Sequence, residues 1–275
     1  MSDWISSFPL TAHVLDFSKR QLCSVLKTGP VPQHIGFIMD GNRRYARQKN
    51  IELKEGHNAG YESMARLLEI CYGCGVKSAT VFAFSIENFN RSNYEIEWLM
   101  ALYKTKFQQI VENGEMCEKY GVRIKIMGDL SLLPDDVSQV LRQSEEITKN
   151  NKRAVLNVCC PYTSRDDITH SMKEVINLNL PEDEITEETL TNHLYSSGSP
   201  KLDLLIRTSG VYRLSDFMLW EIVDLDCQIE ILDILWPEFG ALHLIWILLK
   251  WSFNKTYYGK RMNNLLNIND EKKLQ

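Results

Sequence analysis

The sequence lacks any apolar run long enough to cross a bilayer, which takes about 20 mostly apolar residues. Its most apolar stretch runs only from Ala241 to Leu249, contains His243 and ends at Lys250. Residues 1–22 lack the basic start and the apolar run of a secretory signal, so we expect no signal peptide. Their apolar residues are spaced for an amphipathic element that packs on the protein or touches a membrane surface.

An excess of positive charge is also missing. Lys and Arg number 31 against 36 Asp and Glu, which gives a net charge of −5. General nucleic-acid binding rests on a basic surface, so we expect no nucleic-acid partner. The seven cysteines are scattered and odd in number, which argues against a disulfide framework and favours a reducing compartment. Cys71 and Cys74 have CxxC spacing, but no second pair completes a metal site, so packing in a helix is favoured over redox or zinc chemistry.

The common phosphate-binding motifs are absent as well. No GxxxxGK[ST] P-loop is present, and no GxGxxG follows the first predicted strand. An aspartyl-phosphatase interpretation of IMDGN is weak, because no second Asp stands two residues on. Any phosphate site must therefore be built in another way.

What the sequence does contain is an alternation of short β runs and helical stretches. Six runs rich in Val, Ile and Phe predict strands, at His34–Met39, Ser78–Phe84, Arg123–Met127, Ala154–Cys159, Leu202–Arg207 and Gln228–Leu232. Helices are predicted by an apolar stripe over Tyr61–Tyr72 and at Tyr94–Tyr120, Asp135–Asn150 and Asp166–Leu178. This order predicts one α/β domain with a mostly parallel six-stranded sheet flanked by helices.

Polar clusters follow three of the predicted strands. They are Asp40–Arg44, Ser85–Arg91 and Arg207–Ser215. Because ligands of open parallel sheets bind beyond the carboxyl ends of the strands, we expect these clusters to converge on one rim.

The first cluster opens a basic run, which consists of Arg43, Arg44, Arg47, Lys49 and Lys54. Taken alone, such a run is typical of a solvated helix face. Its position after a buried strand, with Arg207 and Arg213 at another strand end, favours phosphate binding instead. A carboxylate among these arginines, Asp40, suits Mg²⁺, which is typically held by one or two carboxylates and substrate phosphates. His57 is the histidine placed to reach a phosphate.

Six blocks of the sequence resemble successive signatures of the cis-prenyltransferases, the undecaprenyl diphosphate synthase-like family. They read GFIMDGNRRYARQKN, VFAFSIENFNRS, IKIMGDLSLLP, LNVCCPYTSRDDI, LDLLIRTSGVYRLSDFMLW and ILWPEF. The resemblance covers residues 30–255, in the family's order, and is greatest to the catalytic subunits of eukaryotic dehydrodolichyl diphosphate synthases. The all-helical trans-prenyltransferases need DDxxD motifs, which Asp135-Asp136 and Asp166-Asp167 do not complete.

The resemblance implies a reaction and a set of residues for it. Isopentenyl diphosphate units would be added to an allylic primer, farnesyl diphosphate, in Z configuration to give a long polyprenyl diphosphate for dolichol synthesis and protein glycosylation. Asp40 would hold Mg²⁺ and act on the leaving pyrophosphate, and Ser85 and Asn88 would assist proton removal. The substrate-binding positions implied are Gly41, Asn42, Arg43, Arg44, Tyr45 and His57 for the allylic diphosphate, Phe84, Phe89 and Arg91 beside it, and Arg207, Arg213 and Ser215 for isopentenyl diphosphate.

The resemblance also implies a fold in which a dry tunnel lies between the sheet and its helices. The Tyr61–Tyr72 and Tyr94–Phe107 helices would line it. Residues 1–29 would form an N-terminal amphipathic segment, 30–255 the catalytic domain and 256–275 a polar tail. We expect Arg207 and Arg213 to lie away from the first-strand loop, so that each diphosphate has its own cations.

Three positions depart from the family pattern. Arg43 stands where bacterial members have Gly, although Arg there resembles the eukaryotic pattern. Leu53 stands where the family usually has Arg, so Lys54 is a candidate substitute. The position of a metal-binding Glu in bacterial members falls on Gln228, and Asp226 and Glu230 share its predicted strand face. Asp40 is therefore the one protein ligand we expect for the metal.

The end of the sequence, GKRMNNLLNINDEKKLQ, contains no Arg-x-Gly, the motif with which self-sufficient members complete a phosphate site across a dimer. The resemblance thus implies a homologous, non-catalytic subunit that supplies this motif. The apolar residues that crowd the C-terminal third would partly form the interface; they are Leu232, Ile234, Leu235, Trp236, Phe239, Leu242, Leu244, Ile245, Trp246, Leu248 and Leu249. Such a pair would sit peripherally on the cytosolic face of the endoplasmic reticulum or on lipid droplets. The alternative is that this chain is itself a non-catalytic scaffold.

Overall fold

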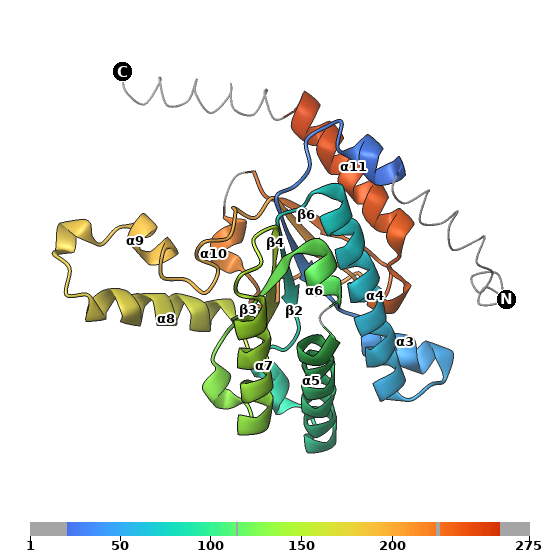
Figure 1. Ribbon diagram of the computed structural model, residues 1–275, viewed down its shortest axis with the longest axis horizontal. Helices are drawn as coiled ribbons and strands as arrows, with labels where there is room; N and C mark the ends of the chain where they lie inside the picture. Colours follow the sequence, from blue (N-terminus) through green and yellow to red (C-terminus); the bar gives the residue numbers. More distant parts are fainter. Residues whose placement is uncertain (1–20, 114, 224–225, 259–275) are drawn as a thin grey trace.

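The computed structural model describes residues 21–258 except 114 and 224–225. Its centre is a six-stranded sheet in the order β3-β4-β2-β1-β5-β6, in which every neighbouring pair is parallel (Figure 1). The strands are β1 (His34–Ile38), β2 (Ser78–Phe82), β3 (Val122–Met127), β4 (Ala154–Cys159), β5 (Leu204–Arg207) and β6 (Gln228–Ile231). The predicted α/β fold is confirmed, although β2 ends earlier and β5 begins later than the apolar runs suggested.

The strand order reverses at β1, which has β2 on one side and β5 on the other. Ile35 of β1 pairs in register with Ala79 of β2 and with Leu204 of β5. Parallel sheets bind ligands outside the carboxyl ends of the strands at such a switch point. The topology therefore points to the segments that follow β1, β2 and β5.

Helices connect the strands, as the alternating pattern predicted. The α-helices are α3 (Asn42–Lys49), α4 (Leu53–Cys74), α5 (Asn93–Asn113), α6 (Glu115–Tyr120), α7 (Asp135–Thr148), α8 (Ser164–Asn177), α9 (Glu187–Thr191), α10 (Leu219–Ile222) and α11 (Ala241–Tyr257). Short 3₁₀ turns are η1 (Ile86–Asn90), η2 (Leu130–Leu132), η3 (Glu182–Glu184) and η4 (Trp236–Glu238). The helix predicted over Tyr94–Tyr120 corresponds to α5 and α6, which lie on either side of residue 114, a position outside the described residues.

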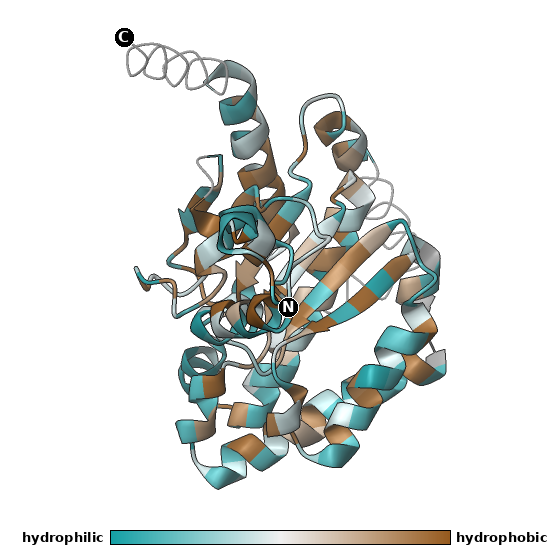
Figure 2. Ribbon diagram, turned by 90° about the vertical axis from the view of Figure 1, so that its left-hand side faces the viewer, coloured by the Kyte–Doolittle hydropathy of each residue, from teal (hydrophilic) through white to brown (hydrophobic). Residues whose placement is uncertain are grey.

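Each face of the sheet carries its own apolar core, because successive side chains of a strand point to opposite faces. On β5, Leu204 and Ile206 join the larger core with α4, α5, α7 and α11. Leu205 points the other way, into a smaller core with Phe217 and Met218 beside α10. Figure 2 shows apolar residues along the strands and a mixture of apolar and polar residues on the helices around them. The part of the larger core beside α4 and α5 borders the cavity described below.

Several expectations fall outside the described residues. Most of the N-terminal segment does, although residues 21–26 are helical and Leu26 is buried. Residues 259–275 of the C-terminal tail, which include Lys260 and Arg261, also lie outside the described residues. The predicted tail begins at residue 256, but α11 continues to Tyr257. Among the described helices, none combines the length and the apolar character needed to traverse a membrane.

Candidate active site

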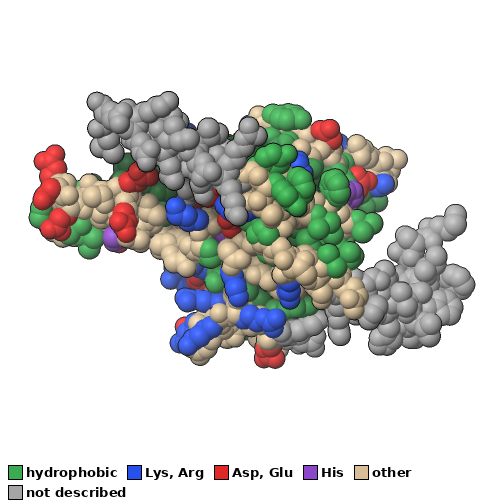
Figure 3. All heavy atoms as spheres, turned by 90° about the horizontal axis from the view of Figure 1, so that it is seen from above, with side chains coloured by type: hydrophobic (Ala, Val, Ile, Leu, Met, Phe, Trp, Pro, Cys, Tyr) green, Lys and Arg blue, Asp and Glu red, His purple; other side chains and the backbone are tan. Residues whose placement is uncertain are grey.

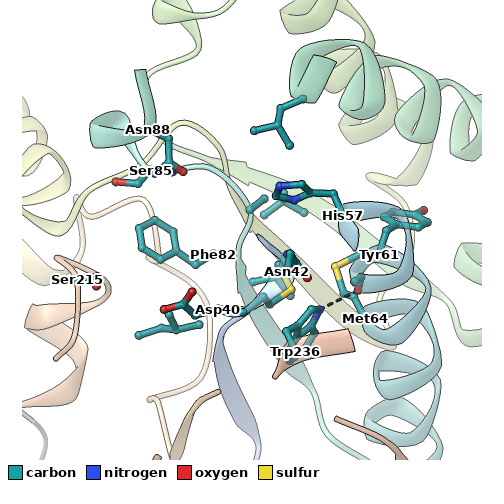
Figure 4. A pocket seen from close by; sticks show the side chains of 18 of the residues that line it. Asp40, Asn42, His57, Tyr61, Met64, Phe82, Ser85, Asn88, Ser215 and Trp236 are labelled. Atoms are coloured by element: carbon teal, nitrogen blue, oxygen red, sulfur yellow. Dashed lines mark hydrogen bonds between the residues drawn. The ribbon is translucent and has the colours of Figure 1, made fainter. Parts of the chain in front are cut away.

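The segments after β1, β2 and β5 meet at the mouth of one cavity, as their positions predicted. The cavity has a volume of about 880 Å³ and extends from this polar mouth to an apolar interior between the sheet, α4 and α5. Figure 4 shows Asp40 and Phe82 near Ser215 on one side and Ser85 with Asn88 on another. The mouth is formed by Asp40, Gly41, Asn42, Arg43, Arg44, His57, Ser85, Asn88, Arg91, Arg207, Arg213 and Ser215.

Asp40 is held by its backbone while its carboxylate faces the cavity. Its carbonyl oxygen accepts hydrogen bonds from Thr208 Oγ1 at 2.7 Å and from Trp236 N at 3.1 Å. Its Oδ2 lies 3.0 Å from Arg207 Nη2, and the side chain stays 39% exposed. The carboxylate is therefore fixed in position yet accessible.

This contact corrects the expectation that Arg207 lies away from the first-strand loop. Arg207 ends β5, which neighbours β1, and its side chain is only 3% exposed. Its Nη1 donates to Ser215 Oγ at 2.9 Å and to the carbonyl of Arg213, and Arg213 Nε donates to the same hydroxyl at 3.3 Å. The cations expected for the allylic diphosphate and those expected for isopentenyl diphosphate therefore meet at the contact between Asp40 and Arg207.

The β1–α3 turn depends on two glycines. Gly41 precedes α3 with φ 117°, a conformation that side chains with a Cβ rarely adopt, and a Cβ there would lie 3.1 Å from Leu235. Gly60 of α4 lets Asn42 approach closely, since a Cβ on it would lie 2.3 Å from Asn42 Oδ1. Trp236 Nε1 donates to the Gly60 carbonyl at 2.8 Å, as drawn in Figure 4. The residues that begin α3, Asn42 and Arg43, line the mouth, and the first amides of a helix have no partner within it, so they are available to an anion.

A buried carboxylate that sequence reasoning missed organises the other side of the mouth. Glu95, in the first turn of α5, is 8% exposed. Its Oε1 accepts from Arg91 Nη1 at 2.8 Å, and its Oε2 lies 3.5 Å from Arg43 Nη1. His57 Nε2 is 3.9 Å away. One carboxylate thus holds the guanidinium groups of Arg43, from α3, and of Arg91, the residue that follows η1. The signal that could have found it is its opposite charge four residues after Arg91.

His57 is uncharged at neutral pH. Burial is the main reason that its pKa falls to about 4, and the nearby charges of Arg91 and Arg43 lower it further. Its ring packs against Trp98 with centroids 5.7 Å apart. His57 can therefore contribute hydrogen bonds to a phosphate but not a positive charge.

Ser85 and Asn88 are fixed by the 3₁₀ turn that they begin. Asn88 Oδ1 accepts from Ser85 N at 3.2 Å, and Ser85 Oγ accepts from Glu87 N at 3.2 Å. This reciprocal capping aims both side chains at the cavity with little rotational freedom. They could accept or relay a proton across the space in front of Asp40.

The interior of the cavity is the tunnel that the resemblance implied. Its walls are apolar side chains from both helices and from the sheet: Tyr61, Met64 and Ala65 of α4, Leu99, Leu102, Tyr103, Phe107 and Ile110 of α5, and Val81, Ala83, Leu156 and Val158. The two helices expected to line it therefore do so. Such a space excludes water from a hydrocarbon chain.

Three predicted substrate residues do not line the cavity. Phe84 is 1% exposed and packs edge-to-face on Phe89, with ring centroids 5.0 Å apart, and on Tyr103. Tyr45 faces Lys49, whose ammonium lies 5.6 Å from its ring centroid. Phe82, the last residue of β2, lines the cavity instead of Phe84.

The candidate substitutes for missing family residues also lie elsewhere. Lys54 pairs with Glu52 at 2.7 Å outside the cavity lining. Gln228 hydrogen-bonds to Glu230, which pairs with Lys250 of α11 at 2.8 Å. Asp226 pairs with Lys255 of the same helix at 3.1 Å. Glu230 and Asp226, the acids around β6, therefore pair with lysines of α11. Within the described residues, no group of three or more Asp, Glu, His or Cys side chains could hold a metal ion.

Arg165 is a further cavity residue that sequence reasoning missed. It follows β4 at the start of α8, and its guanidinium bridges Asp216 at 2.7 Å and Glu87 at 3.2 Å. Polar residues beyond the carboxyl ends of the other strands are candidates for the site, and the same rule applied to β4 would have found Arg165.

Comparison with known proteins places the chain among enzymes of polyprenyl synthesis. Residues 38–259 match the family model described as "Putative undecaprenyl diphosphate synthase". A dehydrodolichyl diphosphate synthase complex subunit of Schizosaccharomyces pombe is 44% identical over 244 residues, 87% of this chain and 92% of the relative. The corresponding human subunit is 41% identical over 251 residues, 90% of this chain and 74% of the relative. The crystal structure of lavandulyl diphosphate synthase from Lavandula x intermedia, with dimethylallyl diphosphate, is similar with a TM-score of 0.75 and 28% identity, over 81% of this chain and 95% of that one.

The Glu95 contacts generate a prediction about phosphate binding. Glu95→Gln keeps the shape of the side chain but removes the charge that holds Arg43 and Arg91 in place. Because hydrogen bonds between charged groups contribute about 1.5–3 kcal/mol, we expect affinity for inorganic pyrophosphate to fall roughly tenfold or more. Calorimetric titration measures this.

The matched control is Glu97→Gln, because Glu97 is an exposed residue on the same helix. This variant should bind pyrophosphate with the affinity of the wild type. Unchanged affinity in a folded Glu95→Gln variant would show that this carboxylate does not organise the mouth.

Proposed function

The chain belongs to the undecaprenyl diphosphate synthase-like family of cis-prenyltransferases, and we propose that its cavity is the active site that extends an allylic diphosphate into dehydrodolichyl-type polyprenyl diphosphate. The observation that carries this proposal is the union of a cationic mouth and an apolar tunnel in one cavity. A diphosphate fits the first and a growing hydrocarbon fits the second. The relatives in dehydrodolichyl diphosphate synthase complexes support the same product class.

In the reaction, the C1–O bond of the allylic substrate breaks and pyrophosphate leaves with the bonding electrons. The double bond of isopentenyl diphosphate supplies the electrons of the new bond at C1, and loss of a proton restores a double bond in Z configuration. Negative charge therefore grows on the leaving group, and preorganised cations are the most effective way to stabilise it. Arg43, Arg44 and the first amides of α3 would bind this diphosphate, whereas Arg207, Arg213 and Ser215 would bind that of isopentenyl diphosphate.

Proton removal is assigned to the segment after β2. Ser85 and Asn88 face the cavity with their orientation fixed by the capping contacts. A proton acceptor must lie within hydrogen-bond reach of the proton that it takes, so this rigid placement supports the assignment.

The donor set at the mouth fits Mg²⁺. A single accessible carboxylate, Asp40, stands among groups that bind phosphate, and Mg²⁺ typically uses few protein ligands and completes its shell with waters and substrate phosphates. When bound, the ion would neutralise part of the charge that develops on pyrophosphate. Asp40 would hold it, with Arg207 keeping the carboxylate in place.

Farnesyl diphosphate is the primer that we propose. The lining next to the mouth changes at once from charged groups to Phe82, Val81 and Ala83, so an allylic hydrocarbon tail meets apolar wall directly beyond its diphosphate. The choice of farnesyl rather than another allylic tail rests on the resemblance to eukaryotic members.

A homologous partner subunit is proposed as well. Of the apolar residues in the C-terminal third, Trp236, Phe239, Leu244 and Leu248 are buried. Others form an exposed stripe along α11, namely Leu242, Trp246, Leu249, Phe253 and Tyr257. Figure 3 shows hydrophobic side chains gathered on the face where α11 lies. A partner would cover such a surface, and the relatives are named as complex subunits. The pair would work at the cytosolic face of the endoplasmic reticulum or on lipid droplets, where its lipid product can leave.

The role of Asp40 is tested in the co-expressed pair. Asp40→Asn should lower kcat about 10²–10³-fold, because the lost charge acts mainly on the transition state, with little change in farnesyl diphosphate affinity. Incorporation of labelled isopentenyl diphosphate into butanol-extractable product measures the rate.

Asp136→Asn, on the exposed first turn of α7, is the control. A fully active Asp40→Asn pair would mean that this chain serves as the scaffold and that catalysis belongs to its partner.

The partner requirement is tested with the purified chain alone, assayed with Mg²⁺, farnesyl diphosphate and isopentenyl diphosphate. We expect the lone chain to be much slower than the pair, since the relatives are named as complex subunits and the family resemblance assigns part of the phosphate site to a partner. Equal rates of long-chain synthesis would refute the proposal.

A further inference from the structure

One charged side chain stands inside the apolar part of the tunnel. Lys106 of α5 lines the cavity among Leu102, Tyr103, Phe107 and Ile110. Every other charged lining residue belongs to the mouth or its rim. Lys106 lies three helical turns beyond Glu95, about 17 Å along α5, so it is far from the diphosphate end.

The Lys106 ammonium is held by an aromatic ring of the opposite helix. Its Nζ lies 4.7 Å from the centroid of the Tyr61 ring, which projects from α4. Among the described residues it has no carboxylate partner. Burial raises the pKa of Tyr61, so its phenol is neutral. The contact is therefore a cation–π interaction in a largely apolar setting.

Besides the contacts of His57 with Trp98 and Glu95 at the mouth, this contact bridges α4 and α5 farther along α5. α5 packs on α7, whereas α4 packs on α11 and η4. The cavity continues between them, lined by the half-buried side chains of Met64, Leu102 and Ile110. Figure 4 shows Tyr61 and Met64 on α4, on the side of the cavity away from Asp40. The Lys106–Tyr61 contact is thus placed across the path that a hydrocarbon takes as it grows away from the mouth.

We propose that Lys106 and Tyr61 form a gate that limits the length of the polyprenyl product. This inference rests on the proposed function of the cavity. A hydrocarbon tip that reaches the gate must displace the ammonium from the ring and cannot solvate it. Elongation slows at that point relative to product release. The flexible lysine stem lets the ammonium swing towards water, so the gate delays longer chains without forbidding them.

The test compares product lengths made by the co-expressed pair with variants of this chain. Lys106→Met keeps an unbranched side chain of similar length but removes the charge, so the product distribution should shift to longer chains by one isoprene unit or more. Lys106→Arg keeps a cation over the ring and should retain the wild-type distribution. Tyr61→Phe retains the ring and should do the same, whereas Tyr61→Leu should lengthen the products.

Lys104→Met is the matched control, because Lys104 pairs with Asp136 at 2.7 Å and does not line the cavity. This control should keep both the product distribution and the rate of the first condensation of the wild type. An unaltered or shortened distribution in Lys106→Met, with normal first condensation, would overturn the gate and leave the proposed function intact. If no variant and no wild-type pair condenses the substrates, the proposed function itself fails.

Discussion

The contact between Asp40 and Arg207 is the interaction on which the site depends. It joins the ends of β1 and β5 at 3.0 Å, where the strand order of the sheet reverses. A guanidinium only 3% exposed needs a charged partner, because an uncompensated buried charge is strongly destabilising. Arg207 in turn holds Ser215 and the Arg213 carbonyl. One ion pair therefore positions the carboxylate proposed to hold the metal and both loops that would bind diphosphates.

An acidic protein creates a strongly basic site by placing carboxylates among its cations. Asp40 holds Arg207, and Glu95 holds Arg43 and Arg91, so guanidiniums that would repel one another keep a fixed geometry. Fixed charges stabilise developing negative charge without the cost of reorganisation. The tunnel behind them provides the opposite environment, in which a hydrocarbon gains from leaving water. The two environments meet within one cavity, so a substrate with a charged head and an apolar tail binds in one orientation.

Much of this arrangement could be predicted from the sequence, because it follows from strand ends. The sheet, its helices and the convergence of Asp40, Ser85 and Arg207 on one mouth required only strand assignments and the rule for parallel sheets. Side-chain direction could not be obtained in this way. Phe84 seemed to continue β2, but the chain leaves the sheet after Phe82, which turns Phe84 into the core against Tyr103. Lys106 reads as an ordinary charge on a helix, because the Tyr61 ring that it contacts comes from a segment remote in sequence. The same holds for the contact of Glu95 with Arg43, although its contact with Arg91 is local.

We propose Asp40 as the protein ligand of the catalytic metal, at a mouth shared by both diphosphates. The most direct measurement is anomalous scattering from Mn²⁺ in crystals of the complex grown with a non-hydrolysable farnesyl diphosphate analogue and isopentenyl diphosphate. The account predicts a manganese peak within coordination distance of the Asp40 carboxylate and of a diphosphate oxygen, about 2 Å from each. It also predicts that the Arg207 side chain lies against the second diphosphate. A peak at Glu230 or Asp226, with Asp40 uncoordinated, would contradict the account.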